Sequence, residues 1–195
     1  MDPGAHRSRI RRRRRDLDAA KRAACAEQVA RRVAGSGWFR RSRRVAAYLA
    51  VGGELDPGPL IERAWALGKT VYLPVLDPLQ PRLWFARYRP GDALAYNRFG
   101  IPEPTAGDRR RLPPWALDLV LAPLVAFDAA GTRLGMGGGY YDRTFGYLRA
   151  RRRWRKPHLV GLAYEFQRVP ELPRRPWDVA LDGCATEHAL YWWTP

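Results

Sequence analysis

The chain has 195 residues and a mass of 22.3 kDa, with 46% hydrophobic and 28% charged residues. This is the composition of a globular domain long enough to bury a core, which argues against wholesale disorder. No apolar run approaches the roughly 18 residues of a membrane span. The two cysteines, Cys25 and Cys184, are too few for a disulfide framework or a four-thiolate zinc site.

Positive charge gathers near the N-terminus. Residues 1–44 hold 15 Lys/Arg and 4 Asp/Glu, a net charge of +11 out of +16 for the chain. The excess suits a nucleic-acid backbone, a solvated helix face in an arginine-biased sequence, or a small polyanionic ligand, and composition does not choose among them. Because Ile10 is followed by five arginines instead of an apolar stretch, we expect a cytoplasmic protein without a secretory signal.

The hydrophobic pattern predicts strands that alternate with helices. A basic helix should begin near Arg7 and end at Val33 or Ala34, before Gly35, and a glycine loop at 135–139 should lead into a helix. Residues 88–116 resemble a loop. This alternation predicts one α/β domain with a mostly parallel sheet over residues 1–195. The expected strands are 45–51, 70–75, 82–87, 117–122 and 158–163, and the expected further helices are 59–67 and 140–153.

Two short motifs suggest nucleotide loops but fail on context. Gly68-Lys69-Thr70 lacks the glycine of a phosphate loop at position 63, and it ends a predicted helix where the motif should open one. The run Gly135-Met-Gly-Gly-Gly139-Tyr140 departs from the dinucleotide fingerprint at its last glycine. We reject both assignments. The three histidines, at 6, 158 and 188, have no metal-ligand spacing.

The stretch from Arg133 to Asp142 carries the strongest chemical signal. Four glycines in five positions let backbone N–H groups approach a ligand, and an arginine supplies a bidentate phosphate donor. Asp142 offers hard oxygen ligands to a divalent cation, and Tyr140 and Tyr141 offer flat faces to a ring. The pattern predicts a nucleotide-phosphate site, although a tight glycine turn with Asp142 compensating a helix dipole would use the same residues.

Residues 123–128 followed by 133–143 resemble the signature of the 5-formyltetrahydrofolate cyclo-ligase family, also called methenyltetrahydrofolate synthetases. Other segments follow the order of that family along nearly the whole chain. They are Tyr48-Leu49, 53–56, Gly68-Lys69, 71–74, Asn97-Arg98, 101–104, Trp177-Asp178 and Thr186.

The resemblance implies a three-layer α/β/α fold and a ligase that uses ATP as co-substrate and Mg²⁺. In that family, ATP phosphorylates the formyl oxygen of 5-formyltetrahydrofolate. The ring then closes to 5,10-methenyltetrahydrofolate, and ADP and phosphate are released. The expected partners are these two small molecules, the expected state is a monomer, and neither a membrane nor a specific nucleic acid is expected.

The resemblance also assigns roles to particular residues. It implies Arg133 and Asp142 as catalytic residues, Asp142 and Asp178 as magnesium ligands, and Leu49 and Glu54 as folate contacts. The implied ATP contacts are Arg7, Arg133, Leu134, Gly135, Met136, Gly137, Gly138, Gly139, Tyr140 and Tyr141, and the segment Met136, Gly137, Gly138, Gly139 and Tyr140 would also contact folate.

The chain departs from the family pattern at two places. Pro3 stands where the family often has a lysine, so either Arg9 or Arg11 substitutes for it or that contact is absent. The family also often has a basic residue where Met136 or Gly138 stands, which leaves more of the phosphate binding to Arg133 and the N-terminal helix.

Two other functions compete with the ligase. A basic module could bind RNA or DNA through the arginine helix, although no recognised nucleic-acid motif supports it. A sugar-phosphate isomerase or acyl-transferase would fit the same fold class, but only by analogy. Most arginines in 11–15 should face water in any case, because a helix turns 100° per residue.

Overall fold

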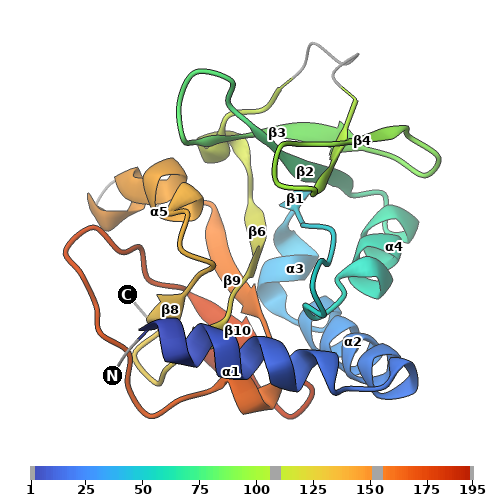
Figure 1. Ribbon diagram of the computed structural model, residues 1–195. Coiled ribbons are helices and arrows are strands. Elements are labelled where there is room, and N and C mark those ends of the chain that lie inside the picture. Colours follow the sequence, from blue (N-terminus) through green and yellow to red (C-terminus); the bar gives the residue numbers. More distant parts are fainter. Residues whose placement is uncertain (1–2, 106–110, 151–155, 194–195) are drawn as a thin grey trace.

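The computed structural model describes residues 3–105, 111–150 and 156–193. Its centre is a seven-stranded sheet with the strand order β11-β10-β9-β6-β1-β2-β3 (Figure 1). Two edge strands, β3 (Leu83–Tyr88) and β11 (Leu190–Trp192), run antiparallel to their neighbours. The other five are parallel: β1 (Arg44–Ala46), β2 (Thr70–Leu76), β6 (Leu119–Pro123), β9 (His158–Leu162) and β10 (Gly183–Ala185).

Strand β6 shows why the sheet lies inside the molecule. Leu119 and Leu121 belong to the core cluster under the helices on one face, whereas Val120 and Ala122 belong to the cluster on the other face. All four are buried, as expected for a central parallel strand that is covered on both sides. The predicted α/β class with a central, mostly parallel sheet is therefore confirmed.

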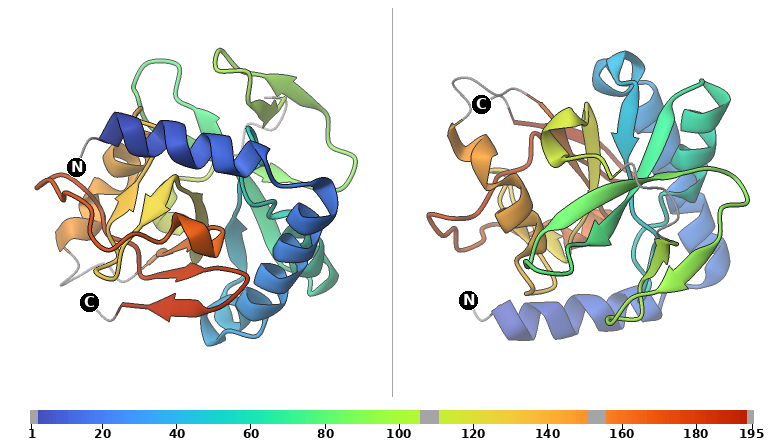
Figure 2. Two further views of the ribbon diagram at one scale, coloured as in Figure 1. Left: turned by 60° about the horizontal axis from the view of Figure 1, so that its bottom comes forward. Right: turned by 90° about the horizontal axis from the view of Figure 1, so that it is seen from above.

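Helices cover both faces of the sheet (Figures 1 and 2). One face carries α2 (Ala19–Ala34), α3 (Gly37–Arg41) and α4 (Gly58–Ala66). The other carries α5 (Tyr140–Phe145), which continues as the 3₁₀ turn η2 (Gly146–Ala150). Helix α1 (Pro3–Arg15) runs across one end of the molecule, from the side of α5 to the side of α2.

The remaining elements are short. Two small antiparallel ladders join β4 (Leu94–Tyr96) to β5 (Pro102–Pro104) and β7 (Ala126–Phe127) to β8 (Arg133–Leu134). Two further 3₁₀ turns are η1 (Pro114–Ala116) and η3 (Glu165–Gln167).

The N-terminal segment forms two helices where the sequence suggests one from about 7 to 34. Helix α1 ends at Arg15, and Asp18 begins α2 by accepting a hydrogen bond from the backbone N–H of Lys21 at 2.7 Å. An aspartate in this role satisfies one of the donors left free at a helix start. The break lets α1 leave the axis of α2 and cross the end of the sheet.

Three other predicted boundaries are wrong. The strand expected at 45–51 ends at Ala46, and the chain then turns at Gly52 and Gly53, both with positive φ. The expected loop at 88–116 contains the β4–β5 hairpin. The helix expected at 140–153 is α-helical only to Phe145, and residues 151–153 lie outside the described residues.

Candidate active site

The candidate site lies where two adjacent parallel strands end. Strand β1 pairs with β2 on one side and with β6 on the other. The chain leaves β1 toward β2 and leaves β6 toward β9, so the two connections run in opposite directions along the sheet. The loop after β1 carries Glu54, and the chain after β6 leads through β7 and β8 to the glycine segment 135–139. Ligands of open α/β sheets bind at such a switch point, outside the carboxyl ends of the strands.

Helix α1 lies against the glycine segment. The Nε of Arg7 donates to the carbonyl oxygen of Gly135 at 2.9 Å, and an Nη of Arg11 lies 3.6 Å from the sulfur of Met136. A Cβ atom at Gly137 would lie 3.8 Å from the Arg7 guanidinium. The basic helix and the glycine segment therefore lie against each other at the candidate site.

Two glycines give the loop its sharp course. Gly137 has φ +108° and Gly139 has φ +64°, conformations that side-chain-bearing residues rarely adopt. Gly139 occupies the N-cap position of α5 and provides no side-chain cap, so backbone groups of this turn remain available to a ligand.

Arg133 and Asp142 form an ion pair. An Nη of Arg133 lies 2.6 Å from Oδ1 of Asp142, and the side chains are 5% and 28% exposed. The pair encloses the backbone of Val179, because the Arg133 guanidinium donates to the Val179 carbonyl and the Val179 N–H donates to Asp142 Oδ1 at 3.1 Å. Burial lowers the pKa of Arg133, and the neighbouring Asp142 acts in the opposite direction.

This arrangement modifies what the sequence suggests for both residues. Arg133 is almost fully covered and two of its donors are occupied, so in this structure it presents little of its guanidinium to a phosphate. Asp142 does more than compensate a helix dipole, because it links α5 to the segment at 179. Its second carboxylate oxygen has no hydrogen-bond partner among the described residues.

Asp178 lies next to this pair. It precedes Val179 in the chain, interacts electrostatically with Arg133, and accepts a hydrogen bond from the backbone N–H of Arg175 at 2.8 Å. No group of three or more His, Cys, Asp or Glu side chains that could hold a metal occurs in the described part of the chain. Two carboxylates nevertheless fit Mg²⁺, which is usually held by one or two carboxylates together with substrate phosphates and water.

Glu54 lies in a second, more enclosed part of the site. It is 7% exposed, and its carboxylate accepts a hydrogen bond from the backbone N–H of Val51 at 3.3 Å. Burial raises the pKa of Glu54, whereas the Val51 N–H and Arg14 act in the opposite direction. Burial also raises the pKa of Tyr141, and the nearby Glu54 adds to this effect. A carboxylate and a phenol of this kind can form hydrogen bonds with a polar ring edge.

Arg14 is the residue of this site that the sequence does not reveal. It alone of the arginines at 11–15 is buried, with 2% exposure, and it donates to the carbonyl oxygen of Leu124. Its backbone packs against Gly53, where a Cβ atom would approach the Cβ of Arg14 to 3.2 Å. Arg14 follows the buried Ile10 by four residues and Arg7 by seven, which places all three on one helix face. That spacing from Ile10 is the available sequence signal.

Tyr140 forms the outer wall of the site. Its hydroxyl accepts a hydrogen bond from Arg98 at 2.8 Å, and its ring meets Phe99 edge-on, with centroids 5.8 Å apart. Leu49, the other expected folate contact, is half-buried and packs against the core cluster beneath α2 and α4. Tyr140 therefore faces the β4–β5 hairpin. Leu49 contributes to the packing of the core.

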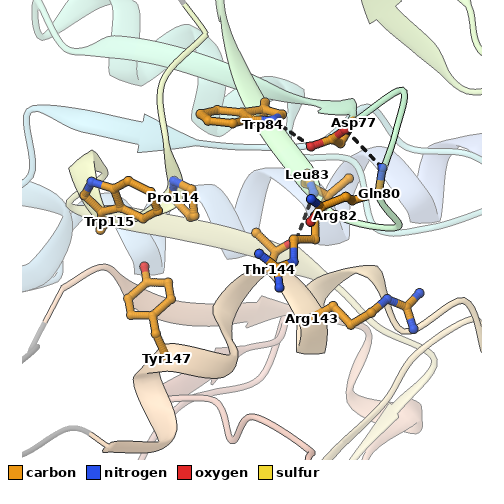
Figure 3. Close-up of a pocket in the computed structure, with 10 residues that line it drawn as sticks. All are labelled: Asp77, Gln80, Arg82, Leu83, Trp84, Pro114, Trp115, Arg143, Thr144 and Tyr147. Atoms are coloured by element: carbon orange, nitrogen blue, oxygen red, sulfur yellow. Dashed lines mark hydrogen bonds between the residues drawn. The ribbon is translucent and has the colours of Figure 1, made fainter.

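A pocket of about 570 Å³ lies beside this site (Figure 3). Its walls come from the β2–β3 turn, strand β3, η1, α5 and η2, and none of the predicted site residues lines it. Arg143 separates it from the glycine segment, because its Nε donates to the Pro81 carbonyl at 2.8 Å and its Nη donates to the Gly138 carbonyl. The residues that line it are Asp77, Gln80, Arg82, Leu83, Trp84, Pro114, Trp115, Arg143, Thr144 and Tyr147.

The helices of the described segments are all too short or too polar to cross a membrane.

Comparison with known proteins agrees with the fold and identifies the family. Residues 2–187 match the model of the 5-formyltetrahydrofolate cyclo-ligase family. The chain is 41% identical to the 5-formyltetrahydrofolate cyclo-ligase of Escherichia coli K12 over 187 residues, which cover 94% of this chain and 100% of that protein. It is 39% identical to the enzyme of the same name from Haemophilus influenzae, covering 90% and 92% of the two chains.

A solved structure shows the same architecture. The NMR structure of 5,10-methenyltetrahydrofolate synthetase from Aquifex aeolicus aligns with a TM-score of 0.80 and 32% identity, covering 98% of this chain and 93% of that one. These similarities define an enzyme of the ligase class built on a mixed α/β sheet. The chain belongs to the 5-formyltetrahydrofolate cyclo-ligase family.

Proposed function

We propose that this enzyme cyclises 5-formyltetrahydrofolate to 5,10-methenyltetrahydrofolate, with ATP as the phosphoryl donor and Mg²⁺ as the metal. The observation that carries the proposal is the position of α1. Arg7 contacts the glycine segment at Gly135, and Arg14, two turns later, packs against the loop that holds Glu54. One basic helix thus joins a phosphate-binding wall to an enclosed carboxylate that suits a pterin.

The phosphate side comprises Arg7, the glycine segment and the two carboxylates. The loop N–H groups and the Arg7 guanidinium would hold the ATP phosphates, since phosphoryl transfer depends mainly on positioning and charge neutralisation. Asp142, through its second oxygen, and Asp178 would hold Mg²⁺, which neutralises phosphate charge when bound. The Arg133–Asp142 pair fixes the direction of the Asp142 carboxylate.

The folate side comprises Glu54, Tyr141 and Tyr140. A carboxylate accepts hydrogen bonds from the amino-pyrimidine edge of a pterin, and the two tyrosines would border the ring system. Leu49 and the residues from Met136 to Gly139 would supply further contacts. The enclosure of Glu54 excludes water from this end, which strengthens its interaction with a bound donor.

The chemistry then follows in two steps. The formyl oxygen attacks the γ-phosphorus of ATP and ADP leaves, which yields an imidate phosphate. The neighbouring folate nitrogen attacks the formyl carbon and loses its proton, and phosphate departs with the former formyl oxygen. Phosphorylation turns an oxygen that leaves poorly into a good leaving group.

Absorbance at the methenyltetrahydrofolate band tests this proposal. Product should form from 5-formyltetrahydrofolate only when ATP and Mg²⁺ are both present, with one ADP released per product. Omitting either one should abolish formation. Equal turnover without nucleotide would overturn the assignment.

The basic helix also bears on the nucleic-acid alternative. Arg7, Arg11 and Arg14 all contact the site, and Arg13 lies over the ring of Phe166. The contacts of α1 therefore favour a small polyanionic ligand over a nucleic acid.

A further inference from the structure

The β4–β5 hairpin carries a turn that is held in a defined shape. Oδ1 of Asn97 accepts hydrogen bonds from the backbone N–H groups of Phe99 and Ile101, at 2.8 and 3.1 Å. Its Nδ2 donates to Glu103 at 2.7 Å, and the same Glu103 oxygen accepts the backbone N–H of Leu76 at 3.0 Å. The turn is thereby tied to strand β2.

This turn presents Arg98 to the glycine motif. The Arg98 guanidinium donates to the Tyr140 hydroxyl at 2.8 Å and lies 5.1 Å from the centre of the Phe99 ring. Phe99 itself meets Tyr140 edge-on. The tip of the hairpin therefore rests on the residue that forms the outer wall of the proposed folate site.

Arg98 retains most of its capacity to bind. The side chain is exposed, and its hydrogen bond to Tyr140 uses one of five N–H donors. No carboxylate among the described residues lies within ion-pair distance of it. A guanidinium held in a fixed direction but without an anionic partner is well suited to a bidentate carboxylate ligand.

The other arginines at this end of the site have contacts of their own. Arg133 is buried against Asp142, Arg143 donates to two backbone carbonyls, and Arg7 donates to Gly135. Arg98 differs from Arg133 because it bonds to a neutral phenol and not to a carboxylate, and from Arg7 and Arg143 because it does not bond to the glycine segment.

The two ends of the proposed folate site differ in their exposure to solvent. Its enclosed end is Glu54 with the half-buried Tyr141 nearby, and the next residue toward the surface is Tyr140, followed by the exposed Arg98. 5-Formyltetrahydrofolate has matching polarity, with an uncharged pterin at one end, an aminobenzoyl ring in the middle and a glutamate with two carboxylates at the other end.

We propose that Arg98 recognises the glutamate carboxylates of the substrate and thereby sets its specificity for the complete folate over its neutral analogues. The inference rests on the proposed function. Tyr140 holds the guanidinium in the direction required, and Phe99 covers the adjoining part of the substrate.

A substrate-truncation cycle tests the proposal. The wild type, Arg98→Ala and a control, Arg89→Ala, are assayed with 5-formyltetrahydrofolate and with its analogue in which both glutamate carboxylates are amides. Arg89 is also exposed and lies in the turn that precedes β4. Thermal melting of each variant shows that it is folded, and KM for ATP is measured alongside.

We expect the wild type to lose about tenfold or more in kcat/KM on the diamide, as for one charge-assisted contact. On the parent substrate, Arg98→Ala should have a kcat/KM lower than that of the wild type by a similar factor. On the diamide, the kcat/KM of Arg98→Ala should equal that of the wild type, and its KM for ATP should be unchanged. Arg89→Ala should match the wild type.

Equal impairment of Arg98→Ala on both substrates would overturn the proposal, because it would indicate that Arg98 only positions Tyr140. A rise confined to KM for ATP would overturn it too. Absence of wild-type turnover on the parent substrate would contradict the proposed function itself. In that case the role of Arg98 is decided by equilibrium binding of the parent substrate and the diamide to the wild type and to Arg98→Ala. If the wild type binds the two compounds equally, the proposal for Arg98 is overturned.

Discussion

Arg133 and Asp142 pair across the glycine segment, with an Nη to Oδ1 distance of 2.6 Å, and both bond to the backbone of Val179. The carboxylate proposed to hold Mg²⁺ is thus also part of the structure that joins α5 to the segment containing Asp178. Catalysis and stability are coupled at this residue.

Asp142→Asn should therefore lose both turnover and stability. The change removes a negative charge from the proposed metal site, so we expect turnover to fall on the order of 10²-fold or more, by analogy with the loss of one transition-state donor. It also weakens the bond to a buried guanidinium, at a cost of about 1–3 kcal/mol. Turnover at limiting Mg²⁺ and thermal melting measure the two effects, and raised Mg²⁺ should restore part of the turnover.

Asp118→Asn provides the matched control. Asp118 accepts hydrogen bonds from the backbone of Arg43 and Arg44 and pairs with Lys156, but it precedes β6 and so lies at the opposite end of that strand from the site. This variant should lose stability and keep its turnover. Near wild-type turnover of folded Asp142→Asn at limiting Mg²⁺ would contradict the metal role.

Glu54→Gln should raise KM for folate more than KM for ATP. The amide keeps the size of the side chain but replaces an acceptor oxygen with a donor, which would face the donor groups of the pterin. Steady-state kinetics with each substrate varied in turn measure the difference. Unchanged folate affinity in equilibrium binding would refute this role.

The same variant should alter the dependence of stability on pH. Burial raises the pKa of Glu54 in the folded state above its ordinary value of 4.5. An acid of this kind favours the folded state below its unfolded pKa, and this contribution is lost as the pH rises through the folded pKa. The melting temperature of Glu54→Gln, relative to the wild type, should therefore rise between pH 4 and pH 8. A constant difference would show that Glu54 does not titrate as described.

Arg7→Ala should raise KM for ATP about tenfold and leave KM for folate nearly unchanged, because Arg7 reaches the glycine segment. Arg12→Ala is the control, since Arg12 lies on the exposed face of the same helix. Equal effects of the two changes would indicate a general effect of positive charge, and a loss of RNA or DNA retention as the only defect of Arg7→Ala would restore the nucleic-acid interpretation.

Arg14→Met should loosen α1. The substitution removes the bond to Leu124, although Gln167 still donates to that carbonyl at 2.9 Å. Because α1 is rich in arginine, trypsin reports how firmly the helix is docked. Cleavage within α1 should be faster in Arg14→Met than in Arg12→Met, and ATP should slow it in both. Equal cleavage rates would mean that Arg14 does not anchor the helix.

The sheet could be predicted because its central strands are continuous apolar runs, as in Leu119–Ala122, and these runs alternate with helical patterns. The split between α1 and α2 was harder to predict, since an arginine-rich segment offers few apolar residues to mark the helix phase. Five consecutive arginines likewise do not by themselves single out Arg14, whose only sequence signal is its spacing from Ile10. The β4–β5 hairpin was missed because Pro102 and Pro104 resemble a loop, although proline is tolerated at edge positions.

The glycine segment and its neighbours could be named from their spacing, but their contacts could not. The Arg133–Asp142 pair depends on Val179, which is distant in sequence and reaches the site only through the folded chain. Arg98 is similar, because its contact with Tyr140 is set by the position of the hairpin.

Isotope transfer tests the central claim most directly. Substrate labelled with ¹⁸O in the formyl group is converted in the presence of ATP and Mg²⁺, and the released phosphate is examined by mass spectrometry. If the formyl oxygen is phosphorylated, each product molecule should be accompanied by one phosphate that carries one ¹⁸O atom. Phosphate without the label, with the ¹⁸O recovered in water, would contradict the mechanism.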